Sequence, residues 1–282
     1  MLTLLFYSPI DDGPLLDRHT LDDALALPGV ELDGQPGDAY RPGRWRDAAT
    51  GATAVIDLGT PPLEEDHLHP PRGYDGWRAA ELTVQIPVTG PHWLAVECLQ
   101  FVEAVLTRLP DLRALDTEDI RQEHSEGPGP WSRPRLLASW ERQHQQHQVG
   151  RTDQRRMARL ASVCLWRYRR ERTEALRRFP ELVWPEALVL FDQEQGAPRT
   201  AALWQDPGHA FALPPVELLV IPRGSSAGVL PAEQLAALGA EALPVAQAAR
   251  VVVSDRARAL AAKAPLLPVT RFRALADHDW SD

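Results

Sequence analysis

The chain has 282 residues, of which 44% are hydrophobic, so it can bury one or two sizeable cores, and global disorder is excluded. The formal net charge is -9, and no apolar run approaches the roughly 20 residues of a membrane-spanning helix. The only cysteines, Cys98 and Cys164, predict no disulfide framework. Because Asp11 and Asp12 precede the first arginine, the start is not typical of a signal peptide, and we expect a cytoplasmic protein.

The first 120 residues predict a small sheet covered by two helices. Apolar and polar residues alternate in 52–58 and 81–88, which is typical of half-buried strands, whereas 92–109 carries an apolar stripe at helical spacing. Residues 33–43, rich in Gly and Pro, are predicted as a loop. The predicted strands are 2–8, 30–32, 52–58 and 81–88, and the predicted helices are 14–27 and 92–109. This order indicates an α+β sandwich close to the ferredoxin-like arrangement.

Residues 121–180 are predicted as a linker followed by two helices. Pro and Gly punctuate 123–133, and the helices are predicted over 135–148 and 152–178. In the second helix an apolar stripe at helical spacing predicts the buried face, comprising Met157, Leu160, Ala161, Cys164, Leu165 and Tyr168.

Residues 181–282 predict a second α+β sandwich. The segment 194–198 has the composition of a hairpin turn, and Pro231 and Gly239 bracket a predicted helix. The predicted strands are 186–192, 200–205, 216–221 and 251–253, and the predicted helices are 232–238 and 256–264. The chain is therefore expected to contain two small antiparallel-sheet sandwiches, in 1–120 and 181–282, joined by the helical segment 121–180.

Charge is distributed unevenly along the chain. Residues 1–120 hold 21 acidic and 8 basic side chains, whereas 121–180 hold 6 acidic and 14 basic ones. The Arg-rich helix predicts a docking surface for a protein partner, for a second copy of the chain, or for the phosphates of a nucleic acid. Tryptophans in Pro- or Gly-containing loops are candidate interface anchors. The candidate interaction residues are Arg155, Arg156, Arg159, Arg167, Arg170, Trp77 and Trp131.

Residues 224–228, with the sequence GSSAG, match the G-x-S-x-G pattern of a serine-hydrolase nucleophile elbow. Ser226, Asp255 and His278 follow the expected order of nucleophile, acid and base. The prolines at 222 and 231 oppose this interpretation, because an elbow serine leads directly from a strand into a helix. A serine hydrolase is therefore kept as an alternative, and a Gly/Ser loop is favoured.

Histidines offer two patterns that could bind a metal. His67 and His69 alternate in an acidic, Pro-rich loop, and His92 could join them as a third ligand. Glu141 and His144 form one Glu-x-x-His half-motif, but no second half-motif accompanies it. We expect exposed polar side chains instead, and no metal or cofactor.

Two apolar, Pro-containing segments carry a family resemblance. Residues Phe179–Glu186 and Ala212–Val220 resemble accessory domains of bacterial ternary conflict systems, in which a MoxR-type ATPase and a von Willebrand A protein act with small partner-specific domains. The resemblance implies a noncatalytic adaptor and transfers no functional residues. We therefore predict a non-enzymatic bacterial interaction module, of a conflict, immunity or ATPase-associated system, with no membrane partner.

Overall fold

The chain folds into two compact units. Unit 1 comprises residues 1–88 and 92–151, and unit 2 comprises residues 89–91 and 152–282. The computed structural model describes residues 1–10, 16–59, 73–118, 128–149, 155–204, 209–223, 226–231, 234, 241–242, 250–252, 255, 259 and 263–282. Both units combine helices with mainly antiparallel sheets, so the predicted α+β class is confirmed. Within these described ranges, no helix has the length and apolar character needed to cross a bilayer.

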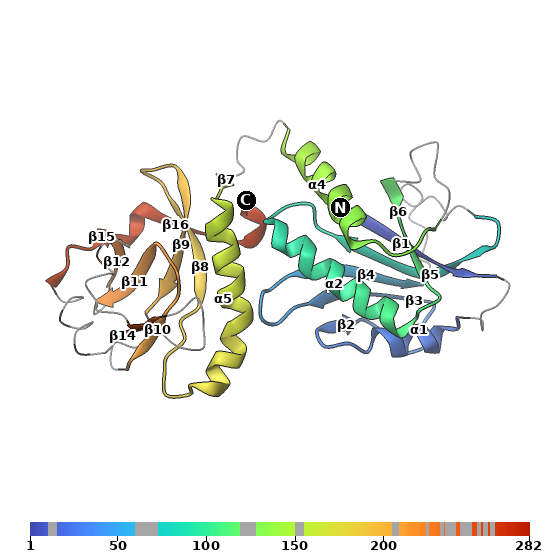
Figure 1. The fold of residues 1–282 in the computed structure, drawn as a ribbon, viewed down its shortest axis with the longest axis horizontal. Coiled ribbons are helices and arrows are strands. Elements are labelled where there is room, and N and C mark those ends of the chain that lie inside the picture. Colours follow the sequence, from blue (N-terminus) through green and yellow to red (C-terminus); the bar gives the residue numbers. More distant parts are fainter. Residues whose placement is uncertain are drawn as a thin grey trace. The chain divides into compact units, whose positions relative to one another are not determined.

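Unit 1 contains one six-stranded sheet with the order β2-β3-β4-β5-β1-β6, in which all neighbours are antiparallel (Figure 1). The register of β1 against β5 shifts between Leu5 and Tyr7. The strands are β1 (Leu2–Pro9), β2 (Val30–Leu32), β3 (Tyr40–Arg46), β4 (Thr53–Gly59), β5 (Trp77–Ile86) and β6 (Arg113–Asp116).

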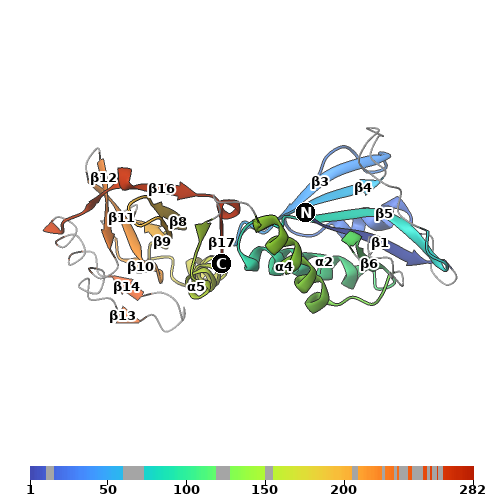
Figure 2. The same cartoon turned by 90° about the horizontal axis from the view of Figure 1, so that it is seen from above.

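Among the described residues, the helices α1 (Arg18–Leu25), α2 (His92–Arg108) and α4 (Arg133–Gln148) accompany this sheet. Helix α2 packs against α1, α4, β4 and β5, and Figure 2 shows α2 and α4 on the same side of the sheet. Alternate strand residues face this side and are buried, as the period of two requires. The core includes Leu2, Leu4, Phe6, Ile56, Leu58, Leu82, Val84, Ile86, Leu99, Phe101, Val102 and Val105.

The predicted loop 33–43 is wrong from Tyr40 onward, because Tyr40–Arg46 pairs with β4 along its whole length. Pro42 and Gly43 lie inside this strand. A Cβ at position 43 would overlap the carbonyl oxygen of Glu31, so the glycine allows the close approach of β2. The second unpredicted strand, β6, has only four residues and is too short for its alternation to be recognised.

Unit 2 contains one long helix, α5 (Arg159–Arg178), which packs against β8 (Figure 1). The main sheet has the order β15-β12-β11-β9-β8-β16, and the β9–β11 pair is its one parallel pair among the described residues. A second sheet has the order β10-β14-β13, and β17 pairs with β7. The strands are β7 (Arg155–Arg156), β8 (Ala187–Asp192), β9 (Ala197–Leu203), β10 (Phe211–Leu213), β11 (Leu218–Arg223), β12 (Ser226–Pro231), β13 (Glu241–Ala242), β14 (Arg250–Val252), β15 (Leu267–Pro268), β16 (Phe272–Leu275) and β17 (Trp280–Ser281).

The main sheet of unit 2 buries apolar side chains on both faces. Leu219 and Ile221 belong to one core cluster together with Trp204 and Phe211, whereas Leu218 belongs to a second cluster with Phe272. Neighbouring residues of a strand point to opposite faces, so β11 contributes to both clusters. This explains its continuous apolar sequence.

The predicted hairpin at 194–198 is confirmed as the β8–β9 connection. Asp192 accepts hydrogen bonds from the backbone N–H groups of Glu194 and Gln195, and Gly196 has a φ of +66°. The left-handed backbone at this position therefore favours glycine.

The helices predicted over 232–238 and 256–264 lie mostly outside the described residues, although residues 234, 255, 259 and 263 are helical.

The two helices of the predicted segment 121–180 belong to different units. Helix α4 contacts α2 and β1 in unit 1, whereas α5 contacts β8 in unit 2. The division between the units therefore falls inside this segment.

Candidate functional site

The inner face of α5 holds the helix on unit 2. Leu165, Tyr168 and Ala175 are buried, and Tyr168 stacks on Trp184 with ring centroids 6.4 Å apart. The Tyr168 hydroxyl donates to the carbonyl oxygen of Pro185 at 2.7 Å, and burial raises the pKa of this phenol. These contacts give α5 a defined orientation.

Two arginines of α5 bind groups of unit 2. Arg169 Nη1 lies 2.9 Å from Asp277 Oδ2, and Arg172 Nε donates to the carbonyl oxygen of Trp184 at 3.0 Å. Both donors therefore take part in the fold.

The opposite side of the helix, here called the α5 outer face, is exposed. Its members recur at helical spacing and are Arg159, Leu160, Arg167, Arg170 and Arg177. The Arg170 guanidinium lies 5.6 Å from the ring centroid of Trp166, within cation–π range. One carboxylate shares this face, since Glu174 lies 3.6 Å from Arg177. The outer face is consequently positive, with apolar side chains between the charges.

Leu160 was predicted on the buried stripe, and this prediction is wrong. The residue is 77% exposed, whereas Leu165 is 2% exposed. The helix begins at Arg159, so Leu160 lies in its first turn and faces away from Leu165 by about 140° at 100° per residue. Helical spacing calculated from the buried Leu165 and Tyr168, rather than from Met157, could have identified it.

The two arginines of β7, the strand before α5, differ in burial. Arg155 is half-buried, and its guanidinium lies 4.0 Å from the ring centroid of Phe191. Arg156 is exposed and pairs with Ser281 in the β7–β17 ladder. Of the five predicted interaction arginines, Arg156, Arg159, Arg167 and Arg170 are thus exposed, whereas Arg155 packs within unit 2.

The two predicted tryptophan anchors belong to unit 1. Trp77 is the first residue of β5, is half-buried and pairs with Pro9. Trp131 is also half-buried, and its Nε1 donates to Glu103 Oε1 at 3.3 Å. Neither lies in the unit that carries the arginines.

Of the GSSAG segment, residues 226–228 belong to β12, which pairs antiparallel with β11, and residues 224 and 225 lie outside the described residues. Ser226 is the exposed first residue of β12 and pairs with Arg223, the last residue of β11. A nucleophile elbow needs a strand that turns directly into a helix, and Ser226 leads into a strand instead. His278 is largely exposed and lies 3.6 Å from its neighbour Asp279, while Asp255 is exposed in a helical turn.

Of the three candidate metal ligands, His67 and His69 lie outside the described residues. His92 begins α2, and its Nε2 lies 3.2 Å from Glu141 Oε1 on α4. His144 is buried, stacks on Trp140 and lies with Nδ1 2.7 Å from the carbonyl oxygen of Val88. Within the described ranges, no group of three or more His, Cys, Asp or Glu side chains could hold a metal ion.

Comparisons with protein-family models, with curated proteins and with solved structures found no match for this chain.

Proposed function

We propose that the protein is a non-enzymatic interaction module that binds an acidic protein partner through the α5 outer face. The observation that carries this proposal is that the arginines of α5 divide into two groups, one bound within unit 2 and one exposed. Arg169 and Arg172 are engaged by unit 2, whereas Arg159, Arg167 and Arg177 project outward from a helix that is anchored along its other side. Arginines on a rigid helix lose little further backbone entropy when they bind.

The mixture of side chains favours a protein over a nucleic acid. Leu160 is 77% exposed, and Trp166 lies beside Arg170 on the same side of the helix. Arginine and tryptophan dominate the binding energy of protein interfaces, whereas an exposed leucine gains nothing from a phosphate backbone. The partner that fits is a protein surface with carboxylates around an apolar patch.

The finer fold assignment is part of the same proposal. The order β6-β1-β5-β4, with α1 after β1 and α2 after β5, supports the proposal of a ferredoxin-like sandwich to which the β2–β3 hairpin is added. The resemblance of residues 179–186 and 212–220 to conflict-system accessory domains supports a bacterial adaptor of such a system. An ATPase or von Willebrand A gene beside the gene for this chain would support this assignment.

The test uses the full chain carrying the triple substitution Arg159→Glu, Arg167→Glu and Arg170→Glu. The partner is first identified by purification from the source cell at low salt, and its affinity for both chains is then measured by calorimetry. We expect the triple variant to lose binding by at least about 100-fold, because like charges replace three attractive ones. A matched triple variant of unit 1, with Arg44, Arg78 and Arg113 changed to Glu, should bind normally.

Two outcomes would contradict the proposal. Equal partner affinity of the wild type and the α5 variant would remove the outer face from the interface. Salt-sensitive binding of labelled RNA or DNA, abolished by the same variant, together with no acidic protein partner, would favour the nucleic-acid alternative.

A further inference from the structure

Positions on the outer side of α5 recur with the spacing of a helix–helix seam. Counted from Leu160, they follow at alternating intervals of three and four residues, which is the spacing of the a and d positions of a coiled coil. At 100° per residue they fall within a strip about 100° wide, opposite to the buried Leu165. These positions, here called the α5 seam, are Leu160, Val163, Arg167, Arg170, Glu174 and Arg177.

The α5 seam is accessible along most of its length. Val163 is half-buried, and the other members are exposed. From Leu160 to Arg177 the seam is about 26 Å long, at a rise of 1.5 Å per residue. A straight strip of this length fits the side of another helix of about five turns.

The chemistry of the seam changes along the helix axis. Leu160 and Val163 are apolar, whereas the positions that follow are charged. Arg177 lies in the last turn, where an arginine also stabilises its own helix, but Arg167 lies in the middle of α5, where that effect has faded. Arg167 is exposed and forms no ion pair within the described ranges. Its guanidinium is therefore available to a partner.

This order of side chains disfavours a second copy of α5 as the partner. In a parallel pair, each charged residue of the seam would face its own counterpart. In an antiparallel pair, Leu160 would face Arg177 of the other copy, and Arg167 would face Arg170. Like charges would oppose one another in both arrangements, which is unfavourable. The partner helix therefore has a different sequence.

A complementary helix must segregate its side chains as the seam does. It needs apolar side chains opposite Leu160 and Val163, and carboxylates opposite the arginines that follow. Carboxylates stabilise a helix when they lie in its first turns, because the N-terminal end of the helix dipole is positive. A helix with acidic first turns and apolar last turns matches the seam only when it runs antiparallel to α5.

We infer that α5 docks antiparallel against an amphipathic helix of the partner protein, acidic in its first half and apolar in its second half. This inference rests on the proposed function and specifies which element of the acidic partner makes the contact. The carboxylates would form charge-assisted hydrogen bonds with Arg167 and its neighbours on the seam. The apolar half would cover Leu160, whose side chain is 77% exposed in the free chain.

The probe is a stapled helical peptide of about five turns, with Glu on one face of its first half and Leu on the same face of its second half. The matched control peptide has the same composition, but its Glu and Leu residues alternate along that face. Fluorescence anisotropy with the full chain at low salt should give a Kd of roughly 10 µM for the probe and at least about tenfold weaker binding of the control. Because the two peptides have the same net charge, the difference measures the effect of order.

A spin label at the N-terminus of the probe measures its orientation. In the antiparallel arrangement the label should broaden the backbone amide NMR signals near Arg177 and leave those near Leu160 unchanged. The opposite pattern would overturn the antiparallel arrangement.

Two substitutions in the seam and one outside it locate the contact. Arg167→Gln and Leu160→Gln should each weaken binding of the probe roughly fivefold or more. Arg273→Gln removes the same charge from an exposed position of β16 and should leave the Kd unchanged. All three side chains are exposed, so unchanged thermal unfolding would show that the fold is intact.

Absence of probe binding up to about 1 mM would overturn the inference. If the triple variant of α5 had nevertheless lost its natural partner, the proposed function would stand and only the helical form of the partner would be wrong. Equal binding of the two peptides, or equal loss in Arg167→Gln and Arg273→Gln, would also overturn the inference. Sedimentation that showed dimers of the full chain, dissociated by Leu160→Gln, would make a second copy the occupant instead.

Discussion

Helices α4 and α5 come from one polar stretch of sequence, yet they differ in what their polar side chains bind. Ser139, Trp140 and His144 of α4 all point inward and contact unit 1. On α5, Tyr168, Arg169 and Arg172 bind groups of unit 2, and the other described arginines of the helix are exposed. The comparison teaches that a polar helix can be attached to its unit through its polar side chains or can present them at a surface, depending on where its donors find acceptors.

The largest expected effect tests the inward contacts of α4. Trp140→Ala should lower the free energy of unfolding of unit 1 by about 3–5 kcal/mol, because it removes a fully buried indole and its bond to Pro87. Urea unfolding followed by amide hydrogen exchange would measure it. The exposed neighbour Arg142 serves as the control, and Arg142→Ala should change little. A loss below about 1 kcal/mol for Trp140→Ala would mean that α4 is not anchored as described.

The second prediction compares how the two units hold a buried carboxylate. Asp116 of unit 1 is bonded to the neutral hydroxyl of Ser139, whereas Asp192 of unit 2 is bonded to the guanidinium of Arg271 through two hydrogen bonds of 2.8 and 2.6 Å. Hydrogen bonds from Arg271 are the main cause that lowers the pKa of Asp192 in the folded state.

A lowered folded-state pKa stabilises unit 2 above the unfolded-state pKa of about 3.9, and this contribution is lost as the pH falls through the folded-state pKa. Asp192→Asn should therefore lower the melting temperature by about 5 °C at pH 7 and by less near pH 3. Calorimetry at both pH values would measure it. An equal decrease at the two pH values would show that the Asp192 charge is not responsible.

The third prediction uses two adjacent arginines of α5. Arg169→Ala removes the ion pair to Asp277 and should destabilise unit 2 by about 1–2 kcal/mol. Arg170→Ala changes the outer face and should cost less than about 0.5 kcal/mol. Urea denaturation of both variants provides the measurement. The reverse order would place the outer face on the wrong side of the helix.

The smallest expected effect is a difference in the labelling rates of the two cysteine thiols. Cys98 on α2 is fully buried, donates to the carbonyl oxygen of Thr53 at 3.3 Å, and has a pKa raised by burial. Cys164 on α5 is partly exposed. Ellman's reagent should therefore label the native chain at Cys164 first. Labelling that persists in Cys164→Ser at the wild-type rate would contradict this difference.

Local patterns predicted the elements whose signals are strong. Alternation predicted β4 and most of β5, the apolar stripe predicted α2, and residues 194–198 predicted the β8–β9 hairpin. The local patterns failed where the preferences of single residues conflict with the pairing of strands in the sheet. Pro42 and Gly43 indicate a turn when considered alone, but in the sheet Gly43 allows β2 to approach β3.

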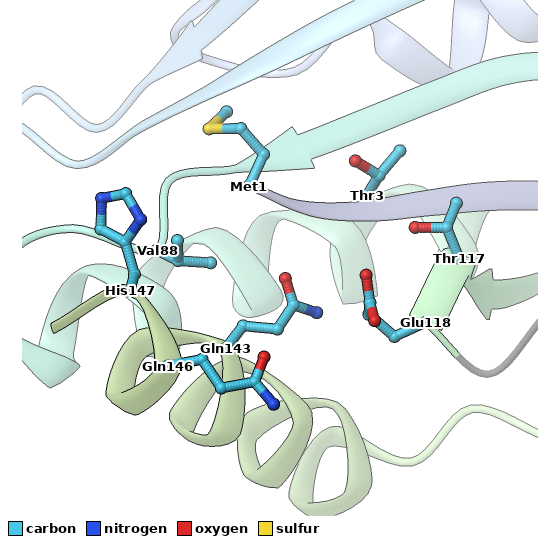
Figure 3. A pocket seen from close by; sticks show the side chains of 8 residues that line it. All are labelled: Met1, Thr3, Val88, Thr117, Glu118, Gln143, Gln146 and His147. Carbon is cyan, nitrogen blue, oxygen red and sulfur yellow. The ribbon is translucent and has the colours of Figure 1, made fainter. Parts of the chain in front are cut away.

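The candidate sites were predictable only in part. The arginine density of α5 predicted an exposed basic surface but not which arginines form it. Arg155 packs on Phe191, a residue 36 positions away that spacing cannot relate to it. The grouping of Thr3, Thr117 and Gln143 around a surface depression of unit 1 (Figure 3) had no sequence signal, because these residues are far apart in the chain.

The amino-acid sequence by itself determined the α+β class, the segregation of charge and most of the two helices predicted over 135–148 and 152–178, because composition and periodicity are local properties. Residues 155–156, predicted as part of the second helix, form strand β7 instead, because they pair with β17. Only the tertiary structure decided which arginines are exposed, where Ser226 lies and which polar groups are buried. Those properties depend on contacts between distant residues, and the burial of each donor is set by the acceptor that the fold brings to it.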